Sequence, residues 1–155
     1  MMSQTIMRIV PLVVAVAVSG CGRGNGKASN QPLEYWLETP ARVRVGEIAP
    51  LRLRVKNNTK KLIELSLGGR PAHNFSAANS KGALVWEWLH NQIVQDILEI
   101  RMLAPGEELI FKAEWNQRDN DGNAVATGTY FLRGILNIDP PKQLVTEPVK
   151  LMIVR

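Results

Sequence analysis

The chain has 155 residues, of which 45% are hydrophobic and 21% charged, and its formal net charge is +5. This length suits one domain of ordinary size, and the composition excludes a disordered chain and a membrane protein with several spans. The Lys and Arg residues are dispersed along the chain, so the positive charge does not indicate a nucleic-acid partner.

The first 20 residues have the pattern of a secretory signal. Arg8 precedes an uncharged, mostly aliphatic run from Ile9 to Val18. That run is too short to cross a bilayer, which takes about 20 apolar residues, but it is typical of a signal peptide. We therefore expect a signal peptide over residues 1–20, with the start codon left open among Met1, Met2 and Met7.

Cys21 follows this signal directly. The sequence Val18-Ser19-Gly20-Cys21 resembles the lipobox of bacterial lipoproteins, in which the cysteine carries the lipid. Cys21 is the only cysteine of the chain, so no intramolecular disulfide is available to it. The sequence predicts a lipid on Cys21, and two or three acyl chains would hold the protein durably in a membrane.

A polar, glycine-rich stretch separates the cysteine from the rest of the chain. Residues 21–31 have the composition of a flexible tether. Gly22 stands where an aspartate would resemble an inner-membrane retention signal. We therefore expect the protein in the cell envelope, and on the outer membrane, facing the periplasm, if the cell has two membranes.

Residues 32–155 show hydrophobic residues with a period of two, which is typical of β-strands. Leu51 to Lys56 alternates aliphatic and cationic side chains, and Ile63 to Leu67 alternates again before Gly68-Gly69. We expect these two strands to form a hairpin around the turn residues 57–60.

Later segments continue the same pattern. Further strands are expected over Tyr130 to Ile138 and Pro148 to Val154. Residues 91–102 are ambiguous, because some apolar residues there have the spacing of a short helical turn. Two groups are each expected to share one strand face: Leu84, Trp86 and Trp88, and then Leu109, Phe111, Ala113 and Trp115.

The expected fold is therefore all-β. We predict an immunoglobulin-like antiparallel β-sandwich of about eight strands with little helix. Gly128-Thr129-Tyr130 resembles the tyrosine corner of such sandwiches, in which the tyrosine hydroxyl bonds to an upstream backbone group.

No catalytic group of residues stands out. His73 and His90 are expected to be surface or edge histidines, since no metal-ligating partner lies near either in the sequence. The single cysteine is assigned to lipid, and the Gly-x-Ser-x-Gly motif of serine hydrolases is absent from the sequence. We expect a protein that is not an enzyme and needs no cofactor.

Asp119, Asp121 and Asn123 suggest a calcium loop, but their spacing does not fit. Gly122 comes fourth where an EF-hand loop needs its glycine sixth, and Tyr130 stands where the closing glutamate belongs. A hairpin turn explains the segment better, because Asn, Asp and Gly tolerate left-handed torsions. We predict no metal site.

The tryptophans leave two interpretations open. Trp86, Trp88 and Trp115 lie on apolar faces of expected strands and are interpreted as core. Trp36 is the one whose exposure would indicate a surface on which a glycan or a peptide could stack.

The connection between the last two expected strands is the candidate partner-binding loop. It contains Pro140-Pro141, which would hold it extended, and loops on sandwiches often carry binding functions. The residues predicted to contact a partner are Lys142, Gln143, Leu144 and Val145.

From Asn74 to Leu136 the order of features resembles the BsuPI-type intracellular proteinase inhibitors. The matching stretches are Asn74-Phe75-Ser76, Leu84-Val85-Trp86-Glu87-Trp88, Leu103-Ala104-Pro105-Gly106-Glu107, Ala113-Glu114-Trp115-Asn116, Gly128-Thr129-Tyr130 and Gly134. This resemblance implies the sandwich fold and inhibition of a serine proteinase. The signal peptide departs from it, because it implies a target outside the cytoplasm.

Two hypotheses for function result. The first is a membrane-anchored, non-enzymatic domain that binds an envelope protein, with a serine proteinase as one candidate partner. If it inhibits in the standard way, the loop Lys142 to Val145 would occupy the enzyme's cleft. The alternative is an envelope module that binds glycan or peptide through exposed aromatic side chains.

Overall fold

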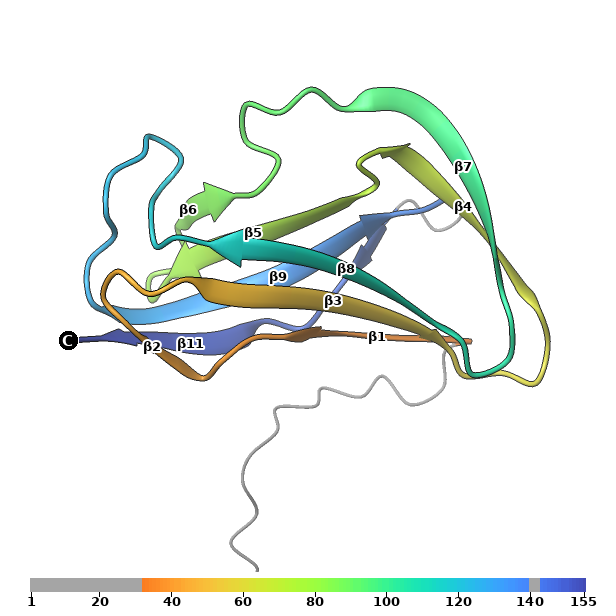
Figure 1. Cartoon of the computed structure of the whole chain (residues 1–155), viewed down its shortest axis with the longest axis horizontal. Helices are drawn as coiled ribbons and strands as arrows, with labels where there is room; N and C mark the ends of the chain where they lie inside the picture. Colours follow the sequence, from red (N-terminus) through yellow and green to blue (C-terminus); the bar gives the residue numbers. More distant parts are fainter. Residues whose placement is uncertain (1–31, 140–142) are drawn as a thin grey trace, which may run out of the picture.

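The computed structural model describes residues 32–139 and 143–155, and the described chain is built from β-strands (Figure 1). The expected signal peptide, the tether and Lys142 lie outside these residues. The all-β prediction is confirmed, with eleven strands in place of about eight: β1 (Leu33–Glu38), β2 (Arg42–Arg44), β3 (Ala49–Asn57), β4 (Ile63–Arg70), β5 (His73–Asn79), β6 (Leu84–Glu87), β7 (Gln95–Leu103), β8 (Glu108–Trp115), β9 (Gly128–Asn137), β10 (Gln143–Val145) and β11 (Val149–Val154). Within these ranges no helix is long and apolar enough to cross a membrane.

The strands form three sheets. A three-stranded sheet has the order β1-β3-β8, and a six-stranded sheet has the order β2-β11-β9-β5-β6 with β10 also beside β9. These two sheets pack face to face as an immunoglobulin-like sandwich. Strands β4 and β7 form a separate two-stranded sheet at one end of it, the β4–β7 ribbon (Figure 1).

The core lies between the two sandwich sheets. Leu51, Leu53 and Val55 of β3 are buried, as their alternation with cations predicts. Gly134 of β9 faces Leu53: a Cβ atom at this glycine would come within 2.9 Å of Leu53 Cδ1 and 3.2 Å of Leu53 Cβ. The missing side chain therefore lets the two sheets approach closely at this point.

The expected hairpin between the strands at Leu51 and Ile63 is wrong. Both edges of β3 are occupied, one by β1 and the other by β8, each antiparallel. Strand β4 therefore has no free edge of β3 to join, and it pairs with β7, from Ile63 opposite Leu103 to Arg70 opposite Gln95. The local alternation was correct, but it does not indicate which neighbour is available.

Two further expectations need correction. The segment 91–102 contains no helical turn, because residues from Gln95 onward form β7. Leu84 does not share a buried face with Trp86: the register of β6 against β5 shifts between Ala77 and Ala78, and Leu84 is 54% exposed. A bulge of this kind reverses which side chains face the core.

The tyrosine corner is present. The Tyr130 hydroxyl donates a 2.7 Å hydrogen bond to the Ala126 carbonyl oxygen, four residues upstream. The Tyr130 ring is buried and meets Trp115 edge to face, with centroids 5.3 Å apart. This contact fixes the entry of β9 into the six-stranded sheet.

Candidate protein-binding site

The most exposed large hydrophobic side chain in the described chain belongs to Ile93, at 90%. It lies in the segment 89–94, here called the Ile93 segment, which leaves the end of β6 and leads into β7 (Figure 1). Residues 92–94 belong to no strand or turn and are all exposed. An isolated apolar side chain in this position is available to a partner.

The base of the Ile93 segment is fixed to the sandwich. Asn74 Oδ1 on β5 accepts hydrogen bonds from the Phe75 amide, at 2.8 Å, and from the Leu89 amide, at 3.0 Å. The side-chain amide of Gln92 donates to the Trp88 carbonyl, and its backbone amide donates to the Leu89 carbonyl at 3.0 Å. The segment thus has a braced base and a free tip.

A group of aromatic rings packs beside the base of the Ile93 segment. His73 stacks on Trp88 with a centroid separation of 4.8 Å, and Phe111 of β8 lies 4.8 Å from His73 as well. Burial lowers the pKa of His73 below its ordinary value. His73 is thus half-buried between the sheets at the first position of β5, whereas His90 is exposed.

Of the predicted loop 142–145, the structure describes residues 143–145. Gln143, Leu144 and Val145 form β10, which pairs with Asn137 to Ile135 of β9, so they lie in a sheet and not in a projecting loop. Leu144 is buried at 5% exposure, because it continues the inner face of that sheet, while Val145 is 38% exposed. The binding role of these residues stays a prediction, with only Gln143 and Val145 accessible.

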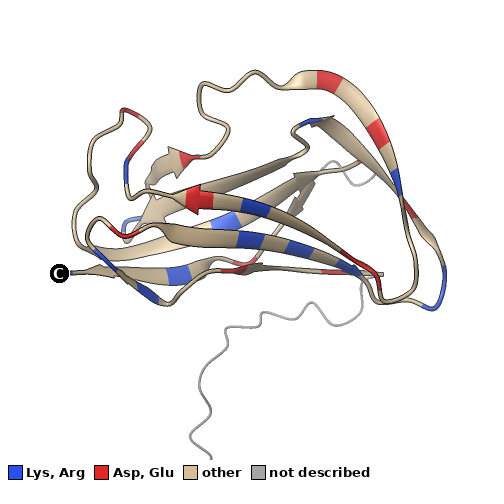
Figure 2. Ribbon diagram, viewed as in Figure 1, with Lys and Arg blue, Asp and Glu red and all other residues tan. Residues whose placement is uncertain are grey.

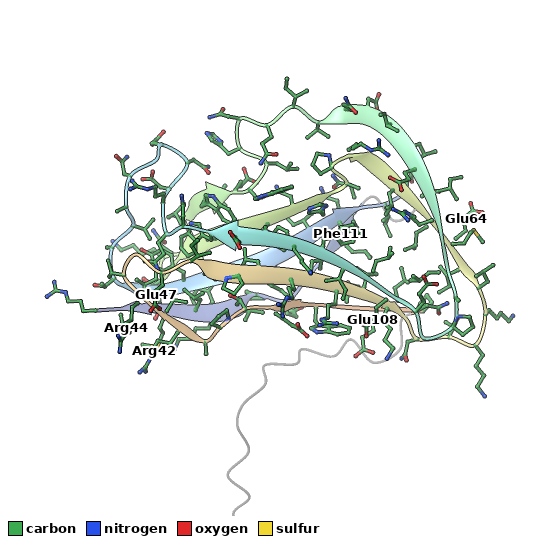
Figure 3. The ribbon with its side chains drawn as sticks, in the orientation of Figure 1. Arg42, Arg44, Glu47, Glu64, Glu108 and Phe111 are labelled. Carbon is green, nitrogen blue, oxygen red and sulfur yellow. The ribbon has the colours of Figure 1, made fainter. Side chains whose placement is uncertain are left out.

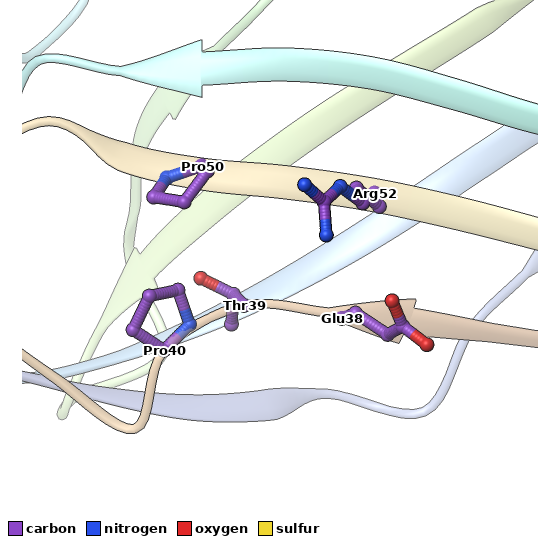
Figure 4. Close-up of a pocket in the computed structure, with 5 residues that line it drawn as sticks. All are labelled: Glu38, Thr39, Pro40, Pro50 and Arg52. Carbon is purple, nitrogen blue, oxygen red and sulfur yellow. The ribbon is translucent and has the colours of Figure 1, made fainter.

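Two shallow hollows are present elsewhere. One, of about 250 Å³, lies where β1 ends beside the start of β3 and is lined by Glu38, Thr39, Pro40, Pro50 and Arg52 (Figure 4). The Thr39 hydroxyl there is buried without a hydrogen-bond partner. The lining contains no histidine, cysteine or second carboxylate, so it offers no pair of groups for acid and base chemistry.

The acid of this hollow is already engaged. Burial opposes ionisation of Glu38, but the hydrogen bond from Trp36 and the Arg54 guanidinium outweigh it and hold the pKa of Glu38 below its usual range. Arg54 forms ion pairs with Glu38 and Glu108, each at 2.9 Å. Figure 2 shows the positions of the Lys and Arg residues along β3. This face of β3 is a charge-balanced surface without a free carboxylate at its centre.

The second hollow, of about 370 Å³, lies between β2 and the end of β11. Its charged lining residues include Arg42, Arg44 and Glu47, which lie at the same end of the molecule (Figure 3). Glu47 accepts a 2.7 Å hydrogen bond from the Arg44 backbone amide, which closes the turn after β2. The glutamate therefore has a structural role there.

The acidic turn also has a structural role. Asp119 Oδ1 accepts hydrogen bonds from the amides of Asp121, at 3.0 Å, and Asn123, at 2.8 Å. In the part of the chain that the structure describes, no group of three His, Cys, Asp or Glu side chains could hold a metal ion.

All four tryptophans are at least partly buried. Trp115 is fully buried and stacks on Trp86 at 5.8 Å, and Trp88 packs against His73. Trp36 is half-buried, and its indole Nε1 donates to Glu38 at 3.1 Å. None of the four is fully exposed, so the aromatic-platform hypothesis gains no support.

Comparison with protein families assigns the chain. Residues 39–140 match the family described as BsuPI, intracellular proteinase inhibitor. The chain belongs to this family. This match includes strands β2 to β9, the β4–β7 ribbon and the Ile93 segment among them, and it confirms the family expected from the order of sequence features.

Other comparisons add little. No curated protein shows a significant match. Among solved structures, the chain is similar to a β-glucosidase from Erythrobacter marinus, with 16% identity and a TM-score of 0.42, over 79% of this chain but only 15% of that enzyme. It is also similar to a CARDB domain from Pyrococcus furiosus, with 16% identity and a TM-score of 0.43, over 79% of this chain and 87% of that domain.

The Ile93 segment was not among the candidate binding residues predicted from the sequence. Residues 91–102 were left ambiguous there, because their apolar spacing also fits a short helical turn. The available signal was Ile93 itself, which follows the polar residues His90, Asn91 and Gln92 without a turn-forming glycine or proline.

Proposed function

We propose that this domain is a non-enzymatic, protein-binding module that inhibits a serine proteinase through the Ile93 segment. Two observations support the proposal: the family match and the 90% exposure of Ile93 on a segment whose base is held by hydrogen bonds. The exposure of Ile93 is the observation that carries it, because a cleft can accept this side chain without any rearrangement of the sandwich.

The geometry suits binding in a proteinase cleft. Ile93 and Val94 belong to no strand, so their backbone groups are free to pair with those of an enzyme. The braces from Asn74 and Gln92 reduce the conformational entropy that binding would remove, which raises affinity. Ile93 would then occupy an apolar side-chain pocket of the enzyme.

The second part of the proposal concerns location. The lipobox-like sequence ending at Cys21 supports an envelope lipoprotein, in which case the target is an envelope or extracellular enzyme and not a cytoplasmic one. The intact mass of the protein isolated from bacterial membranes tests this. A chain that begins at Cys21 with added acyl groups is expected, and an unmodified Cys21 would contradict it.

A titration tests the inhibitory role. A subtilisin-like proteinase is mixed with increasing amounts of the chain, and residual activity on a small chromogenic substrate is measured. The wild-type chain should abolish activity near equimolar amounts, and Ile93→Asp should weaken inhibition at least roughly 100-fold, because a charge is disfavoured in an apolar pocket.

The matched control is Val145→Asp, which places the same charge on β10. If the Ile93 segment binds the enzyme, Val145→Asp inhibits like the wild type. If Val145→Asp loses inhibition and Ile93→Asp keeps it, the predicted residues 142–145 form the site instead. A wild-type chain that is simply digested would refute inhibition through either segment.

A further inference from the structure

Strand β7 has one open edge and an apolar outer face. It pairs with β4 on one side, and in residues 32–139 and 143–155 no strand pairs with its other side. Leu98, Ile100 and Met102 are 63%, 55% and 50% exposed, and they alternate along β7 on the face that also carries Glu64 of β4, labelled in Figure 3. Such an edge is a template for another strand.

The backbone groups of these same residues point outward. The Ser66 carbonyl on β4 accepts a 3.1 Å hydrogen bond from the Asp139 amide, so Ser66 directs its backbone groups away from β7. Ser66 lies opposite Ile100, which makes this a pair without mutual hydrogen bonds. The backbone amide and carbonyl of Ile100 therefore face the open edge. Because the direction of these groups alternates along a strand, those of Leu98 and Met102 face the same edge.

The contrast with β6 shows that this edge is unprotected. Asn120 covers the outer edge of β6: its side-chain oxygen accepts from the Glu87 amide at 2.8 Å, and its backbone amide donates to the Val85 carbonyl at 3.0 Å. The nine residues of β7 include no proline or lysine, two residues that commonly prevent edge pairing, although they include the charged residues Asp96, Glu99 and Arg101.

We propose that the β7 edge binds a second copy of this chain, with the two β7 strands antiparallel about a twofold axis at Ile100. Symmetric antiparallel pairing must place outer-face residues opposite outer-face residues. Ile100 then lies opposite Ile100 of the second copy, and Leu98 lies opposite Met102. The exposed row on each copy would continue into the other across one four-stranded sheet.

Charge selects this register from its neighbours. Centred on Ile100, Glu99 of each copy lies opposite Arg101 of the other. If the twofold axis passed through residue 99, the two copies of Glu99 would lie opposite each other. If it passed through residue 101, the two copies of Arg101 would do so. Like charges at directly opposite positions are unfavourable. The register that pairs opposite charges is therefore also the one that aligns the apolar row.

The charges already present on the ribbon fit this arrangement. Within one chain, Arg101 Nε lies 2.6 Å from Glu99 Oε1, and Arg70 of β4 lies 3.5 Å from Glu99. The second copy would add the same pair in the opposite direction, giving a square of alternating charges. This inference goes beyond the proposed function and does not depend on it, because Ile93 precedes β7 and takes no part in the pairing.

Sedimentation of charge variants tests the partner. The full chain carrying Cys21→Ser is sedimented in mild detergent at roughly 50 µM. At this concentration a dimer with a micromolar dissociation constant is populated. The wild-type β7 should give a dimer. Arg101→Glu places like charges opposite each other and should weaken dimerisation roughly tenfold or more. The swapped variant Glu99→Arg/Arg101→Glu restores opposite charges and should restore the dimer.

Disulfide formation tests the register. In the same Cys21→Ser chain, Ile100→Cys places two cysteines opposite each other, with Cα atoms about 5.5 Å apart, inside the range for a disulfide. Met102→Cys places them roughly 13 Å apart along the strands. Only the first should oxidise to a covalent dimer.

Three results would overturn the proposal. The first is a monomer at every concentration, in which case the edge is free for an extended segment of another protein. The second is a swapped variant that dimerises no more tightly than Arg101→Glu, and the third is disulfide cross-linking of Met102→Cys as fast as that of Ile100→Cys.

Discussion

The side-chain amide of Asn57, at the end of β3, donates a 2.8 Å hydrogen bond to the carbonyl oxygen of Leu103, at the end of β7. The same amide donates to the Lys61 carbonyl at 2.7 Å, and Asn57 Oδ1 accepts from the Thr59 amide at 2.9 Å. The Asn57 side chain is fully buried. One residue thus connects the sandwich to the end of β7 and to the turn that leads into β4.

Replacing Asn57 should therefore destabilise the whole domain. Asn57→Ala leaves the carbonyls of Leu103 and Lys61 without this donor, and the free energy of unfolding should fall by about 2–4 kcal/mol. Urea unfolding followed by tryptophan fluorescence measures it. Asn58→Ala is the control, because Asn58 is exposed, and its effect should stay within about 0.5 kcal/mol. Equal effects of the two changes would exclude this role for Asn57.

The tyrosine corner gives a second prediction. Tyr130→Phe removes the 2.7 Å bond to Ala126 and should cost about 1–2 kcal/mol in urea unfolding at pH 7. Burial also raises the pKa of Tyr130 above its ordinary value of 10.0. The native state therefore keeps a proton that the unfolded chain loses, and wild-type stability should fall as the pH rises above 10. A Tyr130→Phe chain with the same alkaline loss would show that another group causes it.

His73 predicts a pH dependence of stability on the acid side. Burial lowers its pKa below 6.5, so in this pH range the unfolded chain binds more protons than the native state. The free energy of unfolding should thus be highest above pH 6.5 and decrease as the pH falls through that value. His73→Phe keeps an aromatic ring between Trp88 and Phe111. It should flatten the pH profile of the free energy of unfolding between about pH 5 and 7, the range in which histidine titrates. His90→Gln, at an exposed position, is the control for the loss of a histidine.

The close approach at Gly134 gives a fourth prediction. Gly134→Ala would place its new methyl group 2.9 Å from Leu53 Cδ1, and the overpacking should cost about 1–3 kcal/mol. Leu53→Ala alone leaves a cavity and should cost about 2–5 kcal/mol. If contact with Leu53 is the cause, the double variant should be more stable than the sum of the single effects predicts. Strict additivity would assign the cost of Gly134→Ala to another contact.

The sequence predicted the features that depend on local pattern. The alternation around Leu53 identified β3 and its buried face, and Gly128-Thr129-Tyr130 identified the tyrosine corner, because each depends on residues close together in the chain. The pairing of β4 with β7 could not be predicted in this way. It follows from β1 and β8 occupying both edges of β3, and both of those contacts are non-local.

The candidate site was less predictable for the same reason. The two prolines before Lys142 suggested an extended loop, but Leu144 fits the core beside β9, and burial of this side chain draws β10 into the sheet. The sequence left the conformation around Ile93 ambiguous. The exposure of Ile93 results from the path of the chain between β6 and β7, which the bonds to Asn74 fix from a distant part of the sequence.

The most direct test of the proposed function is amide hydrogen exchange of the chain with and without a subtilisin-like proteinase whose active-site serine is replaced by alanine. The proposed function predicts slowed exchange in residues 89–96 on addition of the enzyme, no change in residues 143–145, and loss of this protection in Ile93→Asp. Protection confined to residues 143–145, or no protection at any site, would contradict it.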